Sequence, residues 1–513
     1  SIKIIHIKPE HILLQIVYIL VDARMSYLSL TLIILAFSQS VFCNDGLPIA
    51  AHTMFPKGFM FGAATAAFQI EGGWNADGKG MSIWDNITHE HPDFIVMNEN
   101  ADVTDDSYHL YKEDVRLLKT IGFQVYRFSI SWPRVLPNGR TSYINKAGID
   151  YYMNLIDELL ANGIQPMVTL YHWDLPQALQ DIGGWLNPDI AELFEQYADL
   201  MFQTYGNKVK WWITINEPFS VIWGYGGNAG APNLNLHGTG DYLSGHNLLR
   251  AHGKAYRLYQ KKYSHQGGKL SMAFCGPMCQ PKTESKEDIA AAERCYQFSY
   301  GWFAHPVFKG DYPPVMRELV DKNSKEEGRT VSRLPYFTQE EISEINGTVD
   351  FFGLNYYTTN LINDGVIGDF PSVTRDAHYL TSFDPSWQSS EADWLKIVPQ
   401  GIRLLSNKIR EEYNNPIVIV TENGYPQASQ DDYERISYFE SHFAELRRAI
   451  YEDNCNIVGH TTWSIIDNFE WKQGYTNKFG IVSVDFNNPN RTRTLRRSAQ
   501  WFQHYLAMHK LIQ

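Results

Sequence analysis

The sequence lacks the features that mark several common classes of protein. It has no excess of basic residues, since the net charge is −13 and the isoelectric point is near 5.7. Nucleic acids and anionic membranes favour a basic face, so neither is expected as a partner of the mature chain. No linker rich in Ser, Gly or Pro divides the 513 residues. A single domain is therefore predicted, because large α/β barrels reach this length.

Cysteine is scarce, and no histidine cluster accompanies it. If Cys43 belongs to a leader segment, Cys275, Cys279, Cys295 and Cys455 remain, which allows up to two disulfides in three pairings. The spacing of Cys275 and Cys279 suggests a metal site, but nothing nearby completes it. We therefore expect structural thiols, no metal and no cofactor.

The amino terminus has the pattern of a targeting segment. An apolar stretch over residues 28–37 follows Met25, is too short to cross a bilayer and ends in small or polar residues. It predicts a signal peptide cleaved near Cys43, with a membrane anchor as the alternative. Residues 1–24 would then precede the natural start, 25–43 would form the signal peptide and 44–513 the mature secreted domain.

Three Asn-x-Ser/Thr sequons fit a secreted protein, although each is a weak signal because sequons arise by chance. They are the glycosylation candidates Asn86, Asn346 and Asn490. Whether the chain forms a homodimer is left open by its sequence.

Eight apolar, β-branched or aromatic runs alternate with amphipathic helical patterns. The predicted strands are 59–71, 123–132, 165–173, 209–217, 269–276, 349–358, 416–424 and 457–467. One helix is expected between Asn145, as its cap, and Gly163, as its left-handed end, and others over 189–205 and 433–452. Eight strand–helix units predict a (β/α)8 TIM barrel, with an open doubly wound sheet as the alternative. Gly-Gly-Trp at 72–74 is not a dinucleotide fingerprint, which disfavours the open sheet.

Barrel enzymes carry their chemistry at the carboxyl ends of the strands. Nearly every predicted strand has a polar or aromatic residue at or near this end: Gln69, Arg127, His172, Trp173, Asn216, Glu217, Asn355, Tyr357, Glu422 and Trp463. The fifth strand is the exception and offers only Cys275.

Two of these residues are glutamates. Glu217 lies in Ile-Thr-Ile-Asn-Glu-Pro, and Glu422 lies in Ile-Val-Ile-Val-Thr-Glu-Asn-Gly. Most glutamates are solvated surface charges, but these two directly follow apolar strands and are flanked by residues that end a strand. A pair of carboxylates presented in this way suits glycoside hydrolysis. Aromatics make up 14% of the chain, and although most must fill the core, some suit a site that offers flat faces to a sugar ring.

The residues around both glutamates also carry a family resemblance. Seven motifs resemble those of family 1 glycoside hydrolases, in the family's order and across about 55–505: 55–72, 126–134, 169–176, 214–218, 355–358, 420–424 and 463–471. Secreted insect β-glucosidases are the most similar members. The resemblance implies a retaining β-glucosidase with Glu217 as acid/base and Glu422 as nucleophile.

The resemblance also implies the rest of the site. Sugar hydroxyls would be bound by Gln69, His172, Asn216, Glu470 and Trp471, with Trp463 as a stacking platform and Trp173 and Tyr357 beside them. Arg127 and Asn355 would support catalysis, and Arg127 and Tyr357 would hold Glu422 ionised if they approach it.

The leaving group is less clear from the sequence. Loops 223–240 and 361–394 are expected to form its side of the pocket, and neither reveals a ligand. The expected partner is a small β-glucoside or oligosaccharide. A thioglucosidase that cleaves glucosinolates is the alternative, for which a sulfate-binding Arg or Lys would be expected. A catalytically silent sugar-binding relative is less favoured because both carboxylates are present.

Overall fold

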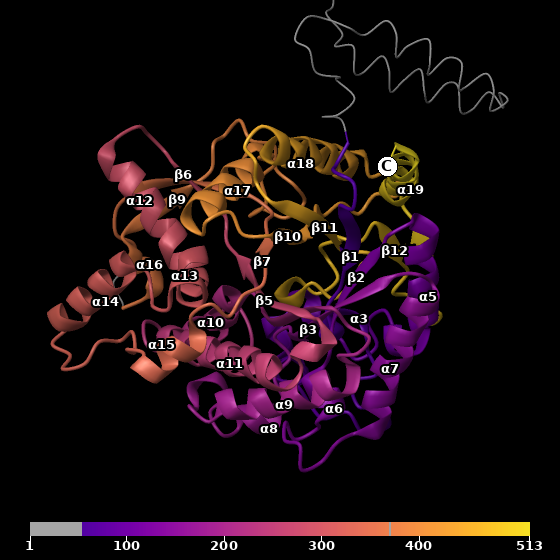
Figure 1. The fold of residues 1–513 in the computed structure, drawn as a ribbon, viewed down its shortest axis with the longest axis horizontal. Coiled ribbons are helices and arrows are strands. Elements are labelled where there is room, and N and C mark those ends of the chain that lie inside the picture. The colour runs from indigo at the N-terminus through magenta and orange to yellow at the C-terminus, as the bar shows by residue number, and fades with distance from the viewer. Residues whose placement is uncertain (1–53, 369–370, 513) are drawn as a thin grey trace, which may run out of the picture. The chain divides into compact units, whose positions relative to one another are not determined.

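Eight parallel strands close into a barrel in the computed structural model, which describes residues 54–368 and 371–512 (Figure 1). In order around the barrel they are β1 (Met60–Ala64), β2 (Val125–Ser129), β3 (Gln165–Tyr171), β4 (Trp211–Asn216), β5 (Lys269–Cys275), β7 (Phe352–Asn355), β10 (Val418–Asn423) and β11 (Ile457–Trp463). Pairing of β11 with β1 closes the ring. The TIM barrel is confirmed and the open sheet is wrong. The predicted signal peptide and the segment before it lie outside the described residues.

The predicted strands all exist, but several are shorter than their apolar patterns. The first window also contains helix α3 (Ala67–Ile70), so Gln69 lies on a helix and not at a strand end. The window 349–358 contributes only the four residues of β7 to the barrel. Apolar runs continue past the paired residues because the loops at this end of the barrel are buried as well.

A long helix follows each barrel strand and covers its outer side (Figure 1). These helices are α5 (Ser107–Ile121), α7 (Lys146–Ala161), α9 (Ile190–Tyr205), α11 (Gly240–Lys262), α13 (Trp302–Lys309), α17 (Gln400–Glu412), α18 (Tyr433–Tyr451) and α19 (Arg497–Ile512). Gly163 ends α7 with a φ of +74°, as predicted. The side chain of Asn145 does not cap α7. Its amide donates instead to the carbonyls of Asp77 and Arg134, each at 2.9 Å, and so fixes the preceding loop.

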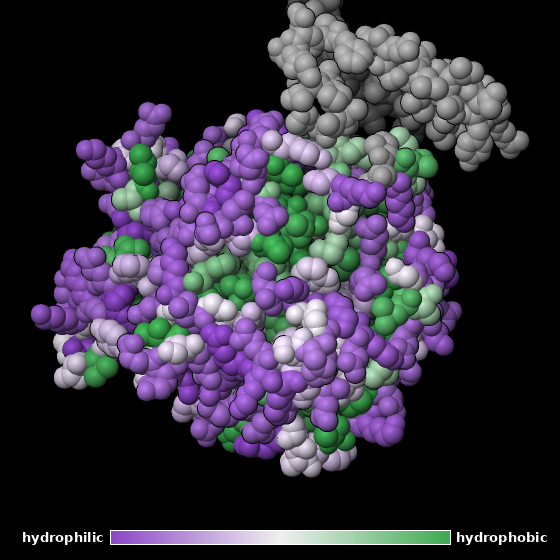
Figure 2. All heavy atoms as spheres, viewed as in Figure 1, coloured by the Kyte–Doolittle hydropathy of each residue, from purple (hydrophilic) through white to green (hydrophobic). Residues whose placement is uncertain are grey.

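Apolar side chains fill both the inside of the barrel and the layer between strands and helices. A small inner cluster comprises Val125, Met167, Ile213, Ala273, Phe351 and Ile419. Figure 2 shows apolar residues gathered near the centre of one face, with polar residues over the surrounding helices. The barrel is therefore a packed core and not a pore.

Smaller elements lie outside the ring. A sheet of β6 (Met278–Pro281), β8 (Thr359–Asp364) and β9 (Tyr379–Ser382) follows the ends of β5 and β7, and β12 (Val482–Val484) pairs with β13 (Arg493–Leu495). The other α-helices are α4 (Ile83–Glu90), α6 (Trp132–Val135), α8 (Gln177–Gln180), α10 (Pro218–Gly226), α12 (Lys286–Tyr296), α14 (Pro314–Glu326), α15 (Gln339–Ile345) and α16 (Val373–Ala377).

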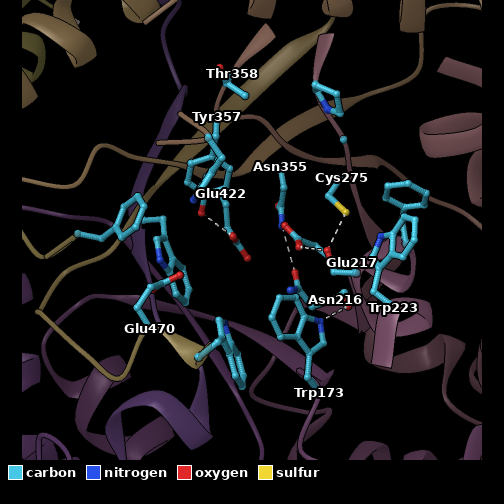
Figure 3. Close-up of a pocket in the computed structure, with 18 of the residues that line it drawn as sticks. Trp173, Asn216, Glu217, Trp223, Cys275, Asn355, Tyr357, Thr358, Glu422 and Glu470 are labelled. Atoms are coloured by element: carbon cyan, nitrogen blue, oxygen red, sulfur yellow. Dashed lines mark hydrogen bonds between the residues drawn. The ribbon is translucent and has the colours of Figure 1, made fainter. Parts of the chain in front are cut away.

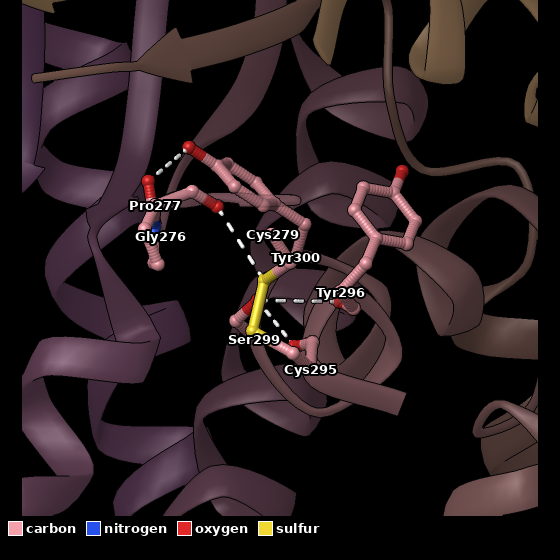
Figure 4. The surroundings of a disulfide bond; sticks show 7 residues. All are labelled: Gly276, Pro277, Cys279, Cys295, Tyr296, Ser299 and Tyr300. Atoms are coloured by element: carbon pink, nitrogen blue, oxygen red, sulfur yellow. Dashed lines mark hydrogen bonds between the residues drawn. A yellow bond between two sulfur atoms is a disulfide. The ribbon is translucent and has the colours of Figure 1, made fainter. Parts of the chain in front are cut away.

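One disulfide joins this outer sheet to a helix. Cys279 on β6 is bonded to Cys295 on α12 (Figure 4). Cys275 and Cys455 are buried free thiols. Of the pairings that the sequence leaves open, the structure therefore contains a single bond.

Candidate active site

The carboxyl ends of the strands surround a cavity of about 390 Å³ (Figure 3). Ten of the predicted site residues line it: His172, Trp173, Asn216, Glu217, Asn355, Tyr357, Glu422, Trp463, Glu470 and Trp471. Arg127 and Gln69 are not among the lining residues. Both are fully buried, and each hydrogen-bonds to a glutamate that lines the cavity.

Glu217 follows β4, where the pairing with β5 is irregular between Ile213 and Asn216. Its backbone is left-handed, with φ of 45°, which a residue with a side chain rarely adopts without a functional reason. Its Oε1 accepts a hydrogen bond from the Asn355 amide at 2.7 Å, and its Oε2 accepts one from the Ser220 hydroxyl at 2.8 Å. Burial, followed by the negative charge of Glu422, raises the pKa of Glu217 to about 7.

Glu422 lies on β10, close to another irregularity of pairing. Bulges of this kind re-aim side chains and are frequent beside active sites. Arg127 Nη1 lies 2.6 Å from Glu422 Oε1, and the Tyr357 hydroxyl donates to Oε2 at 2.7 Å. Glu422 therefore has a buried guanidinium on one oxygen and a donated hydroxyl on the other. The two glutamates thus occupy the same cavity in different electrostatic surroundings.

Asn216 connects these surroundings. Its Oδ1 accepts from Arg127 at 2.5 Å and from Asn355 at 3.2 Å, so its Nδ2 is the amide group that faces His172 Nε2 at 3.0 Å. Burial lowers the pKa of His172, which makes the ring neutral. With Nε2 accepting, the proton lies on Nδ1, which is buried and has no protein partner. His172 therefore offers a free donor.

Glu470 and Gln69 form the other polar side of the cavity. The Gln69 amide donates to Asn468 Oδ1 at 3.0 Å, to the Phe469 carbonyl at 2.9 Å and to Glu470 Oε2 at 3.3 Å. The side-chain oxygen of Gln69, Oε1, is buried without a partner. Burial and the charge of Glu422 raise the pKa of Glu470 to about 8. Buried polar atoms without partners are rare, so this side of the cavity is suited to a polar ligand.

Indole rings surround these polar groups. The centroid of the His172 ring lies 5.9 Å from that of Trp463 and 6.0 Å from that of Trp471, and both pairs are stacked. The ring centroids of Trp173 and Trp471 are 4.4 Å apart. Trp173 and Trp471 have left-handed backbones, with φ of 78° and 49°. Flat apolar faces beside convergent hydrogen-bonding groups match a sugar ring, which has both kinds of surface.

The outer part of the cavity is aromatic. The sequence predicted which loops form it but not which of their residues line it. Its lining includes Phe219, Trp223, Phe383 and Trp394. Three of them fall within the two loops that the sequence predicted for this side. Their identity as wall residues had no sequence signal, because loop aromatics are also common in cores. Cys275, the last residue of β5, lines the cavity together with Gly276 and Pro277, which follow it.

No Lys or Arg lines the cavity in the part of the chain that the structure describes. Nor do three His, Cys, Asp or Glu side chains gather as a metal site among residues 54–368 and 371–512. Of the helices in these same ranges, none combines the length and apolar character needed to span a bilayer.

A barrel with two buried carboxylates over a sugar-sized cavity defines a glycoside hydrolase. The chain belongs to glycosyl hydrolase family 1, whose model matches residues 51–511. It is 50% identical to myrosinase 1 of Brevicoryne brassicae over 460 residues, which cover 89% of this chain and 99% of that protein. It is 44% identical to human cytosolic beta-glucosidase, over 87% and 96% of the two chains. The solved structure of aphid myrosinase superposes with a TM-score of 0.86 at 50% identity, over 88% and 99% of the chains. The predicted retaining β-glycosidase is confirmed at this level.

Proposed function

We propose that Glu422 is the nucleophile and Glu217 the general acid and base in the hydrolysis of β-glucosides. The observation that carries this assignment is the contrast between their surroundings. Arg127 and Tyr357 surround Glu422 with positive charge and a donated hydrogen bond, whereas burial raises the pKa of Glu217 to about 7. Two carboxyl groups whose environments differ in this way suit one ionised and one protonated role.

The reaction then has two displacements. Glu422 attacks the anomeric carbon while Glu217 protonates the departing oxygen, which leaves a glycosyl ester on Glu422. The ester removes the charge of Glu422, which is the second-largest cause of the raised pKa of Glu217. Loss of this charge lowers the pKa of Glu217, so Glu217 stays ionised after it has given up its proton. Its carboxylate then takes a proton from the attacking water. Retention requires carboxyl groups about 5–5.5 Å apart, which a shared cavity supports.

The glycone is proposed to lie between the buried polar groups and the indole rings. His172 Nδ1 and Gln69 Oε1 would bind sugar hydroxyls, since neither has a protein partner. Glu470, Asn216, Trp173 and Trp471 line the same region, and Trp463 would stack beneath the ring. A sugar with a missing or inverted hydroxyl would leave one of these buried groups unpaired, which discriminates strongly.

The aglycone is proposed to be uncharged and aromatic. Phe219, Trp223, Phe383 and Trp394 line the outer cavity, and no Lys or Arg lines it in the part of the chain that the structure describes. An anionic aglycone would enter this environment without a lining cation to neutralise it, which is unfavourable in a partly desolvated site.

A thioglucosidase remains a second candidate because of the 50% identity with myrosinase 1 and with aphid myrosinase. Cleavage of a glucosinolate would require the sulfate to be bound without a lining Lys or Arg. Initial rates on an aryl β-glucoside and on an aromatic glucosinolate separate the two. We expect kcat/KM to be at least about 100-fold higher for the glucoside, since an unpaired charge costs a few kcal/mol. A glucosinolate rate equal to or above that of the glucoside would reverse the assignment.

The roles of the two glutamates can be tested with leaving groups of different acidity. Glu422→Ala should abolish turnover of every substrate, with a small anion such as azide restoring it on activated glucosides. Glu217→Ala should reduce turnover of a poor leaving group by about 10³-fold and of a dinitrophenyl leaving group far less, because protonation matters only for the former. Equal losses on both substrates would contradict the acid role of Glu217. Circular dichroism checks that both variants fold.

Secretion and glycosylation are proposed on separate grounds. The disulfide Cys279–Cys295 fits an oxidising compartment. Asn346 and Asn490 are exposed, whereas Asn86 lies in α4 and the hydroxyl of its sequon threonine, Thr88, bonds to the Trp84 carbonyl at 2.9 Å. Glycans are therefore expected at Asn346 and Asn490 and not at Asn86. A fall in mass on enzymatic deglycosylation that is lost in the Asn346→Gln/Asn490→Gln variant checks this.

A further inference from the structure

Ser220 occupies an unusual position beside Glu217. It lies in the first turn of α10, three residues after Glu217, and its backbone amide donates to the Glu217 carbonyl at 2.9 Å. Its hydroxyl lies 2.8 Å from Glu217 Oε2 and 3.5 Å from Cys275 Sγ. Figure 3 shows Cys275 and Glu217 side by side at the edge of the cavity. The hydroxyl thus has two partners and a single hydrogen to donate.

The geometry assigns the proton of Glu217 to one oxygen. Oε1 accepts from the Asn355 amide at 2.7 Å, and an amide group can only donate. Oε2 is therefore the oxygen that carries the proton in the acid form. In that form the Ser220 hydroxyl cannot also donate along the same line to Oε2, so its hydrogen needs another acceptor.

Cys275 supplies that acceptor. Its thiol is buried and outside the disulfide, and burial raises the pKa of the thiol, so the sulfur is protonated and only a weak acceptor. The position of this sulfur is fixed by the backbone that follows it. The Tyr300 hydroxyl lies 2.6 Å from the Gly276 carbonyl and 2.9 Å from the Asn355 carbonyl, which ties the ends of β5 and β7 together (Figure 4).

We propose that Ser220 is a positioning residue whose hydroxyl donates to Glu217 Oε2 when the carboxylate is ionised and turns to Cys275 Sγ when Oε2 is protonated. This inference rests on the proposed role of Glu217 as acid and base. When Oε2 gives its proton to the departing oxygen, the Ser220 hydrogen rotates to the new anion. When the attacking water returns a proton to Oε2, the Ser220 hydrogen rotates back to sulfur. Ser220 itself gains and loses no proton.

Because sulfur is a weak acceptor, the hydrogen bond of Ser220 favours the ionised form of Glu217 over the protonated form. The Ser220 hydrogen bond to Glu217 is stronger in the ionised form, so Ser220 stabilises the base form more than the acid form. It opposes burial and the charge of Glu422, which raise the pKa of Glu217 to about 7. Ser220 therefore limits how far that pKa rises.

Other charged and titratable groups act on Glu217 from the surrounding elements. Glu422 on β10, Arg127 on β2 and Cys275 on β5 all influence its charge, and Tyr300, Tyr357 and Glu470 interact with it from the loops and helices above the barrel. Of these groups, Cys275 loses a contact when the Ser220 hydroxyl is removed, so its contribution is tested separately.

The test is the pH dependence of kcat/KM for an aryl β-glucoside with a poor leaving group. Ser220→Ala should move the basic limb upward by about one pH unit, because a hydrogen bond to the ionised form is lost. Ser220→Thr keeps a hydroxyl and should restore the limb. An upward shift in Ser220→Ala of less than about 0.3 pH unit would overturn the inference.

The role of Cys275 is tested in two backgrounds. Cys275→Ala leaves the Ser220 hydrogen no partner except Oε2, so the basic limb should move to lower pH by less than Ser220→Ala moves it upward. In the Ser220→Ala background the same substitution should add nothing. A shift of equal size in both backgrounds would show that the thiol acts on Glu217 without Ser220.

Glu217→Gln separates this inference from the proposed function. It should remove the basic limb from the residual activity on the same substrate. If the limb persists, Glu217 is not the acid and the proposed function fails. If the limb disappears in Glu217→Gln but stays in place in Ser220→Ala, only the role of Ser220 is wrong.

Discussion

The inner and outer halves of the cavity are built in different ways. Inner residues such as Glu422 and Asn216 lie on barrel strands, are almost fully buried and share hydrogen bonds through Arg127. Outer residues such as Trp394 and Phe383 lie beyond the barrel strands and are 47% and 37% exposed. The inner half is rigid and polar, so it selects a sugar by hydrogen bonds. The outer half is aromatic and partly solvated, so it tolerates variation in the leaving group.

The largest expected effect comes from the inner half. Gln69→Ala removes an unpartnered acceptor and the donor to Glu470, and it should lower kcat/KM for an aryl β-glucoside by about 10²-fold. Gln266→Ala is the matched control, because Gln266 is also buried with an unpartnered Oε1 but lies in the 3-10 turn Ser264–Gln266 after α11, far along the chain from these motifs. Similar losses in both variants would mean that the effect is structural, and the contrast between the halves would be lost.

A second prediction concerns the stability cost of the inner half. The pKa of Glu470 rises from 4.5 to about 8 in the folded protein, so between these pH values the folded state binds a proton that the unfolded state lacks. Folding stability should therefore fall as pH rises through this window. Glu470→Gln removes the titration, and its melting temperature relative to the wild type should increase from pH 5 to pH 8.5. A difference that is independent of pH would indicate that Glu470 is not buried in this way.

The smallest effect is expected in the outer half. Trp394→Ala should raise KM for an aryl β-glucoside by about 3- to 10-fold, because a partly exposed aromatic contact is lost. The KM for methyl β-glucoside should stay unchanged, since that aglycone does not reach the wall. Trp501→Ala on α19 is a control for loss of a partly exposed indole. Equal changes for both glucosides would place Trp394 against the sugar and remove the distinction between the halves.

The same contrast explains how far the sequence could predict the structure. The eight barrel strands were predictable because apolar runs alternate regularly with helical patterns, and residues directly after them, such as Glu217, must lie at the rim. Gln69 was expected at a strand end but lies on α3, because its apolar run covers a strand and a helix together. Phe383 and Trp394 could not be identified, since their place depends on long loops without periodicity. Ser220 was missed because a single hydroxyl in a helix carries no pattern.

The sheet of β6, β8 and β9 has a consequence for changing the substrate preference of this scaffold. Pro277 precedes β6, Asn360 lies on β8 and Phe383 follows β9, and all three line the cavity. Among the residues that the structure describes, the strands of this sheet pair only with one another, and the disulfide between Cys279 and Cys295 joins the sheet to α12. The sheet can therefore be exchanged as a cassette between related enzymes, which would transplant one wall of the leaving-group site while the ring that holds both glutamates keeps its own hydrogen bonds.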